Sequence, residues 1–94
     1  MNKIALITGA TSGIGQATAL KAAEAGFDII ITGRRTERLE ALAKEIRNKG
    51  VDVLTLNFDI RQAAEVTKAI DGLTGKWKEI AVLVNNAGLA VGVN

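Results

Sequence analysis

The sequence predicts an α/β fold built on a parallel sheet with helices on both of its faces. Four short apolar segments recur along the 94 residues, and three segments of helical composition or periodicity separate them. Glycine lies at most of the transitions, where the chain is expected to turn. Strands that alternate with helices through short connections are typical of a doubly wound sheet with right-handed crossovers. Because 94 residues suit one small domain, we expect a single domain over residues 1–94.

The first part of the chain predicts a strand, a helix and a second strand. Residues 4–7 are a continuous apolar run before a glycine-rich turn, which indicates a buried strand. Residues 13–25 are rich in alanine, and Gly26 follows where helix-ending glycines lie. Residues 29–31 are three consecutive isoleucines before Gly33. Because β-branched residues favour strands, this segment is the second strand.

A second helix is expected between Thr36 and Gly50. Thr36 is the expected N-cap, and Glu37 in the first turn carries the charge that suits a helix N-terminus. The apolar side chains of this segment recur at helical spacing and share one face: Leu39, Leu42, Ala43 and Ile46. Gly50 is expected to end the helix.

The rest of the chain predicts a third strand over residues 51–57, a third helix over 62–73 and a fourth strand over 80–84. The expected spatial order of the four strands is 3-2-1-4, which leaves the fourth strand at an edge. That strand has no proline, bulge signal or lysine to protect a free edge, so we expect another strand beside it. We therefore expect the chain to be a segment of a longer protein.

The composition excludes several classes of chemistry. The chain has no cysteine, histidine, tyrosine or proline, which excludes disulfides, Cys/His zinc sites and nucleophile–histidine pairs. The excess of positive charge lies in residues 34–49, where six Lys or Arg face three Glu, and it indicates an anionic partner there. This patch is small and lacks interleaved aromatics, so we expect no nucleic acid. With no membrane-length apolar run and no signal peptide, we expect a cytoplasmic protein.

A glycine-rich turn joins the first strand to the first helix, with the pattern T-G-x-x-x-G-x-G from Thr8 to Gly15. Such a turn before a helix presents unpaired N–H groups and the positive end of the helix dipole to a phosphate. A literal G-x-G-x-x-G is absent, and an ordinary glycine turn is the alternative interpretation. The candidate phosphate-binding residues are Gly9, Thr11, Ser12, Gly13, Ile14 and Gly15.

This turn, together with Asn85-Asn86-Ala87-Gly88 after the fourth strand, resembles the two N-terminal signatures of the short-chain dehydrogenase/reductase family. The resemblance covers essentially the whole chain and implies the N-terminal part of a Rossmann fold. Residues 33–39, Trp77 and residues 88–90 further resemble the bacterial 3-hydroxy acid (serine) dehydrogenase branch. Ala81 departs from that branch, whose members commonly have Asp there. Trp77 itself is expected to pack or to lie on the surface.

Arg34 and Arg35 follow the second strand, about 20 residues after the glycine turn, where dinucleotide folds meet the adenosine ribose. An acidic residue there would accept from the ribose 2′-hydroxyl and repel a 2′-phosphate, and none is present. The two guanidinium groups suit a phosphate, so we expect NADP(H) in preference to NAD(H). A solvated basic start of the second helix is the alternative.

By resemblance, five further residues contact the adenosine part of the cofactor: Asp59, Ile60, Asn86, Ala87 and Gly88. Asp59 would accept a hydrogen bond from the adenine amino group. It could also cap the third helix, and the two roles are compatible. Asn85 is expected to tie the central strands together.

The resemblance places the catalytic groups outside this chain. In the family a Tyr acts as acid and base, helped by a Lys four residues later, a Ser and an Asn, and the chain has no tyrosine. We therefore expect no catalytic residue within residues 1–94. The longer protein is expected to be an oxidoreductase that moves hydride between NADP(H) and an alcohol or carbonyl substrate of the 3-hydroxy acid class, as a homo-dimer or homo-tetramer.

Two other functions fit parts of the pattern. A non-catalytic NADP(H)-binding or sensor module would use the same turn and the same arginines. Extended sugar-nucleotide epimerases usually space their glycines as G-x-x-G-x-x-G, which this turn does not match.

Overall fold

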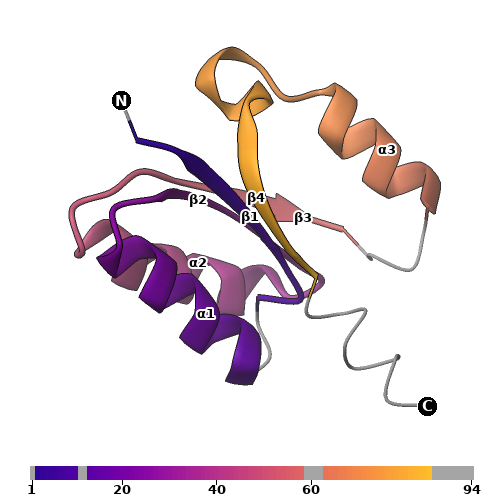
Figure 1. Ribbon diagram of the computed structural model, residues 1–94. Coiled ribbons are helices and arrows are strands. Elements are labelled where there is room, and N and C mark those ends of the chain that lie inside the picture. Colours follow the sequence, from indigo (N-terminus) through magenta and orange to yellow (C-terminus); the bar gives the residue numbers. More distant parts are fainter. Residues whose placement is uncertain (1, 11–12, 59–62, 86–94) are drawn as a thin grey trace.

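The computed structural model describes residues 2–10, 13–58 and 63–85 (Figure 1). The described elements, in chain order, are β1 (Ile4–Thr8), α1 (Gly13–Glu24), β2 (Asp28–Gly33), α2 (Thr36–Arg47), β3 (Val53–Asn57), α3 (Ala63–Asp71), the 3-10 turn η1 (Gly75–Lys78) and β4 (Ile80–Asn85). All strand pairs are parallel, and the sheet order is β3-β2-β1-β4. The expected α/β fold and strand order are therefore confirmed.

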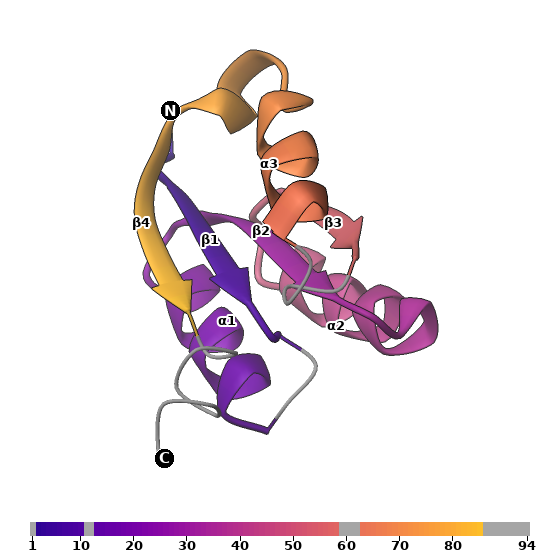
Figure 2. The same ribbon diagram turned by 90° about the vertical axis from the view of Figure 1, so that its right-hand side faces the viewer.

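Helices cover both faces of the sheet, as Figure 2 shows with β4 at the left of the sheet. Because side chains alternate along a strand, Ala5 and Ile7 face α1 and α2, and they belong to a cluster that includes Leu39 and Ile46. The other face carries Leu6 and a second, smaller cluster beneath α3 and η1. Its members are Ile4, Leu6, Ile30 and Leu73, with Leu54, Leu56, Ile70, Trp77 and Ile80 packed against them. Trp77 is therefore a packing residue.

The three isoleucines of β2 lie at the centre of this core. Ile29, Ile30 and Ile31 are each 0% exposed. Their strand has a neighbour on each side, since Ile29 pairs with both Ala5 and Val53. A central parallel strand is covered on both faces and paired at both edges, which explains why it is continuously apolar.

The start of α2 differs from the expectation. Arg35, not Thr36, occupies the N-cap position, with φ −104° and ψ 104°, and no side chain caps the helix there. Thr36 is the first helical residue, and its hydroxyl accepts a 2.6 Å hydrogen bond from Nδ2 of Asn57. The N-cap prediction was wrong, since the extended residue before the helix is Arg35 and Thr36 already lies within the helix.

Strand β4 lies at an edge of the sheet, as expected, but its pairing is irregular. Ile4 pairs with Ile80 while the next residue, Ala5, pairs with Val82, so the register shifts at Ala81. Such an irregularity is a common feature of edge strands, and the sequence carried no signal for it. Beyond it, Val82 is 39% and Leu83 63% exposed, on opposite faces of the sheet. Within the described residues β1 is the neighbour of β4.

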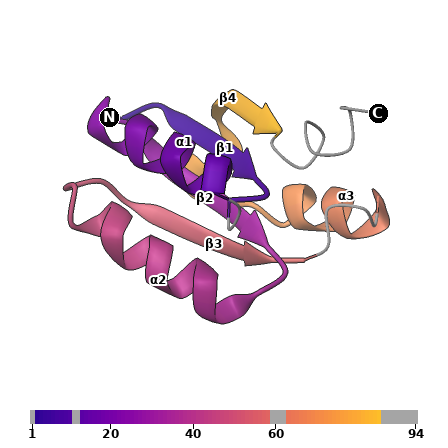
Figure 3. The ribbon, with the colours of Figure 1, turned by 90° about the horizontal axis from the view of Figure 1, so that it is seen from below.

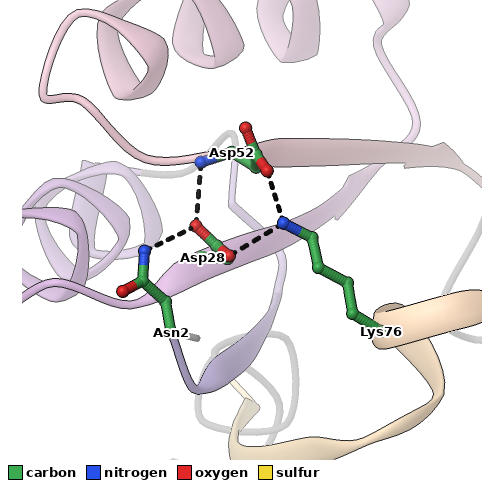
Figure 4. A network of polar contacts seen from close by, with 4 residues as sticks. All are labelled: Asn2, Asp28, Asp52 and Lys76. Carbon is green, nitrogen blue, oxygen red and sulfur yellow. Dashed lines mark hydrogen bonds and ion pairs between the residues drawn. The ribbon is translucent and has the colours of Figure 1, made fainter.

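A polar network joins the residues at the N-terminal ends of β1, β2 and β3 (Figure 4). Asp28, whose side chain is 4% exposed, accepts hydrogen bonds from Nδ2 of Asn2 at 3.2 Å and from the amide of Asp52 at 2.9 Å. Lys76 of η1 forms a 3.0 Å ion pair with Asp28 and a second ion pair with Asp52. The Lys76 ammonium also lies 4.9 Å from the centre of the Trp77 ring. This network therefore attaches η1, which leads into β4, to β2 and β3.

The network shifts two pKa values in opposite directions. Burial raises the pKa of Asp28, but the hydrogen bonds from Asp52, Lys76 and Asn2 and the charge of Lys76 together outweigh it, so the pKa lies below its usual value. Hydrogen bonds to Asp52 and Asp28 raise the pKa of Lys76. Both shifts favour the ionised forms at neutral pH.

Candidate functional site

The carboxyl ends of the four strands all lie at the same end of the sheet, because all four strands are parallel (Figure 3). Thr8 pairs with Asn85 at the ends of β1 and β4, and Gly33 pairs with Asn57 at the ends of β2 and β3. The turns that begin at Gly9 after β1 and at Arg34 after β2 therefore leave the sheet side by side. Ligands of open α/β sheets bind at this carboxyl edge, where the strand order changes direction.

The three glycines of the first turn have three different environments. Gly9 has a φ of 63°, a left-handed conformation that favours glycine. A Cβ on Gly15 would lie 2.2 Å from the carbonyl oxygen of Gly9 and 2.8 Å from Cα of Ala10, so α1 can approach the turn only with glycine there. A Cβ on Gly13 would meet nothing within 4 Å. Gly9 and Gly15 thus shape the turn, whereas Gly13 faces open space at the helix start.

The glycine turn is attached to both neighbouring strands. The amide of Ala10, a residue that is 0% exposed, donates a 3.0 Å hydrogen bond to the carbonyl of Thr32 on β2. The hydroxyl of Thr8 donates a 3.4 Å hydrogen bond to the carbonyl of Val84 on β4. These contacts hold the N-terminal end of α1 against the middle of the sheet edge.

The first turn of α1 has the electrostatics of an anion site. It contains no acidic side chain, so the positive end of the helix dipole is not neutralised from within the helix. Ile14 is 69% exposed beside Gly13, which leaves this end of the helix accessible. An accessible helix start with an open glycine is suited to a phosphate.

Arg34 and Arg35 lie next to this turn, directly after β2, and both are exposed. The turn that carries them is held from β3. The amide of Phe58 donates to the carbonyl of Gly33 at 3.1 Å, and Nδ2 of Asn57 donates to the carbonyl of Arg34 at 3.3 Å. The guanidinium groups therefore belong to a fixed turn on the strand adjacent to the glycine turn.

A groove follows β3 on the side of α3. Its lining residues come from the end of the strand and from one face of the helix: Thr55, Leu56, Asn57, Phe58, Glu65, Lys68 and Ala69. Its apolar members could accept a flat ring, and Lys68 adds a positive charge.

Of the residues expected to bind the cofactor, the structure brings together those of the glycine and arginine turns: Gly9, Gly13, Ile14, Gly15, Arg34 and Arg35. The others lie outside the described residues: Thr11, Ser12, Asp59, Ile60, Asn86, Ala87 and Gly88. Asn57 was not among the residues that the sequence led us to expect at this site. One signal could have revealed it. Asn57 is a polar residue at the end of β3, and the neighbouring strand β2 ends at Gly33, directly before Arg34 and Arg35.

The described part of the chain contains neither a metal-binding cluster nor a membrane-spanning helix. Over residues 2–10, 13–58 and 63–85, no three acidic side chains gather in a way that could hold a metal ion. In the same part of the chain, no helix has the length and apolar character needed to cross a membrane.

Comparisons with known proteins agree with this architecture. The NADP-dependent 3-hydroxy acid dehydrogenase of Salmonella typhi is 47% identical over 90 residues, which are 96% of this chain and 35% of that protein. The serine 3-dehydrogenase of Rhizobium radiobacter is 49% identical over 92 residues, or 98% of this chain and 36% of that protein. The crystal structure of an actinorhodin polyketide ketoreductase with NADPH matches at a TM-score of 0.81 and 33% identity, covering 90% of this chain and 33% of that one.

The chain spans about a third of the length of these curated relatives. A single family model extends over nearly all of the chain. Since that model, described as short chain dehydrogenase, matches residues 3–94, the chain belongs to the short-chain dehydrogenase family.

Proposed function

We propose that this chain is the nucleotide-binding part of an NADP(H)-dependent oxidoreductase. The observation that carries the proposal is the exposed pair Arg34 and Arg35 after β2, in a turn without an acidic residue. The accessible N-terminus of α1 follows the neighbouring strand, β1. The two turns offer positive charge at two places along one sheet edge. NADP(H) carries a pyrophosphate and a 2′-phosphate, which match them.

The described residues fit this cofactor. The open space at Gly13 allows a pyrophosphate to approach the backbone of α1, since any larger residue would place a side chain there. The groove beside Asn57 and Phe58 could hold the adenine ring, with Asp59 and Ile60 completing it. Asn86, Ala87 and Gly88 would lie along the ribose, and Thr11 and Ser12 beside the pyrophosphate. When bound, the nicotinamide of the cofactor supplies or accepts a hydride.

The reaction that we propose for the longer protein is hydride transfer between NADP(H) and an alcohol or carbonyl substrate of the 3-hydroxy acid class. The activities for which the two relatives are named support this class, because serine is itself a 3-hydroxy acid. Residues 1–94 bind and orient the cofactor, and we assign no catalytic residue among them. A cytoplasmic location and a homo-dimeric or homo-tetrameric assembly complete the proposal for the longer protein.

The test is the affinity of the chain for NADPH and NADH, measured by calorimetry. We expect tighter binding of NADPH, and we expect the double variant Arg34→Ala/Arg35→Ala to bind NADPH about tenfold more weakly, the loss of roughly one charge-assisted hydrogen bond. Its affinity for NADH should change little, since NADH lacks the 2′-phosphate.

The matched control is Lys44→Ala/Arg47→Ala, which removes two positive charges from exposed positions in the last turn of α2. It should leave the NADPH affinity within about twofold of the original, because these charges lie at the other end of the helix and are screened by salt. Equal affinity of the unmodified chain for the two cofactors would contradict the proposal. So would an equal loss of NADPH affinity in both double variants.

A further inference from the structure

We propose that Asn57 is a positioning residue that holds the arginine turn in the conformation that receives the 2′-phosphate, so that it sharpens the preference for NADPH over NADH. The inference rests on the proposed function. Asn57 is the last residue of β3, and its amide nitrogen reaches the connection between β2 and α2. It donates to the carbonyl of Arg34 at 3.3 Å and to the hydroxyl of Thr36 at 2.6 Å.

The chemistry of the two contacts fixes which end of the amide faces the turn. A backbone carbonyl can only accept, so the group opposite the oxygen of Arg34 must be the nitrogen of Asn57. That nitrogen carries two hydrogens, and the two acceptors lie one residue before and one residue after Arg35. A single side chain therefore contacts the residues on both sides of Arg35, through the backbone carbonyl of Arg34 and the side-chain hydroxyl of Thr36.

The local structure of the turn explains why such a contact matters. Arg35 is the N-cap residue of α2 and has an extended backbone, with no side chain capping the helix from within the turn. Arg34, Arg35 and Thr36 are all exposed, so core packing does not restrain them. An unrestrained turn would have to become ordered when a phosphate binds, and that ordering weakens affinity.

The role of Asn57 can be separated from the fold. The sheet pairing of Gly33 with Asn57 and the hydrogen bond from the amide of Phe58 to the carbonyl of Gly33 use backbone atoms alone. They persist when the side chain of Asn57 is shortened. The side chain is exposed, so its removal leaves no cavity in the core.

The experiment compares NADPH and NADH affinities of Asn57→Ala by calorimetry. We expect the NADPH affinity to fall about fivefold, the effect of losing hydrogen bonds of ordinary strength, while the NADH affinity stays within about twofold. The control is Asn48→Ala, an exposed asparagine at the C-terminal end of α2, which should leave both affinities unchanged.

Two further variants test the same contact from the other side. Thr36→Val removes the acceptor hydroxyl and should lower the NADPH affinity selectively. Thr36→Ser keeps the hydroxyl and should retain the affinity of the original chain. Combining Asn57→Ala with Thr36→Val should lower the NADPH affinity by less than the sum of the two single losses. Both changes remove the same hydrogen bond, the one between Asn57 and Thr36.

Three results would overturn the inference. If Asn57→Ala weakens NADPH and NADH alike, the residue acts through the fold or through the proposed adenine groove that it lines, and not through the arginine turn. If it changes neither affinity while Arg34→Ala/Arg35→Ala still removes the preference, the proposed function stands and the positioning role fails. If the original chain shows no preference for NADPH, the proposed function and the inference fail together.

Discussion

Replacing Gly15 by alanine is expected to lower the free energy of unfolding by about 3 kcal/mol or more. The added Cβ would lie 2.2 Å from the carbonyl oxygen of Gly9 and 2.8 Å from Cα of Ala10. Both neighbours are backbone atoms, and the turn that contains them is tied to β2 through the amide of Ala10. Neither can yield without moving α1 away from the core that Ala19 and Ala23 form with the sheet.

The matched control is Gly13→Ala, in the same helical turn. A Cβ there would meet nothing within 4 Å, and alanine favours a helix over glycine, so the stability should be equal or slightly higher. Urea unfolding followed through the fluorescence of Trp77 and through circular dichroism measures both variants. Equal stability of the two variants would contradict the close approach of α1 to the turn. Under the proposed function, Gly13→Ala should also bind NADPH more weakly while remaining fully folded.

Replacing Asp28 by alanine is expected to lower the free energy of unfolding by about 2 kcal/mol. The carboxylate is nearly buried and accepts hydrogen bonds from Asn2, the amide of Asp52 and Lys76. Its removal leaves Asn2 and the amide of Asp52 without this acceptor, leaves Lys76 with Asp52 alone, and releases η1 from the start of β2. The partly exposed Lys76 can recover hydration, which keeps the loss below that of a fully buried ion pair. Asp71→Ala, at an exposed position at the end of α3, is the control and should have little effect.

The same carboxylate gives the stability a dependence on pH. Because the pKa of Asp28 in the folded chain lies below its ordinary value of 3.8, the folded state favours the ionised form. The stability that this provides is present in full above that ordinary value, and it is lost as the pH falls through the lower pKa of the folded state. In urea titrations, the stability difference between the original chain and Asp28→Ala should be constant near neutral pH and should shrink below about pH 4. A difference that grows in acid would contradict this assignment.

Most of the fold could be predicted because its signals are local. The apolar runs that became β1, β2 and β4 are continuous, and Gly26 and Gly50 have φ values of 94° and 90° where the helices were expected to end. The glycine turn was likewise visible as a pattern of residue types at fixed spacing.

The features that could not be predicted depend on residues far apart in the chain. The contact of Asn57 with Thr36 joins residues that are 21 positions apart, and no local pattern indicated it. The network around Asp28 includes Lys76, 48 residues further along, and no periodicity connects the two. The register shift at Ala81 depends on how β4 meets β1, which a pattern within one strand does not show. Tertiary contacts decided each of these points.

Hydrogen bonds to the carbonyl groups at the end of β2 fix the distance between the glycine turn and the arginine turn. Three consecutive ones, of Thr32, Gly33 and Arg34, accept hydrogen bonds from Ala10, Phe58 and Asn57 respectively. The glycine turn and the arginine turn are therefore both attached to β2. Neighbouring strands lie about 4.8 Å apart whatever their sequence. The sheet thus fixes the distance between the two turns that we propose to bind the phosphates of the cofactor. Side chains can tune how strongly each turn binds, but the spacing at which a ligand must carry its charges is set by the backbone.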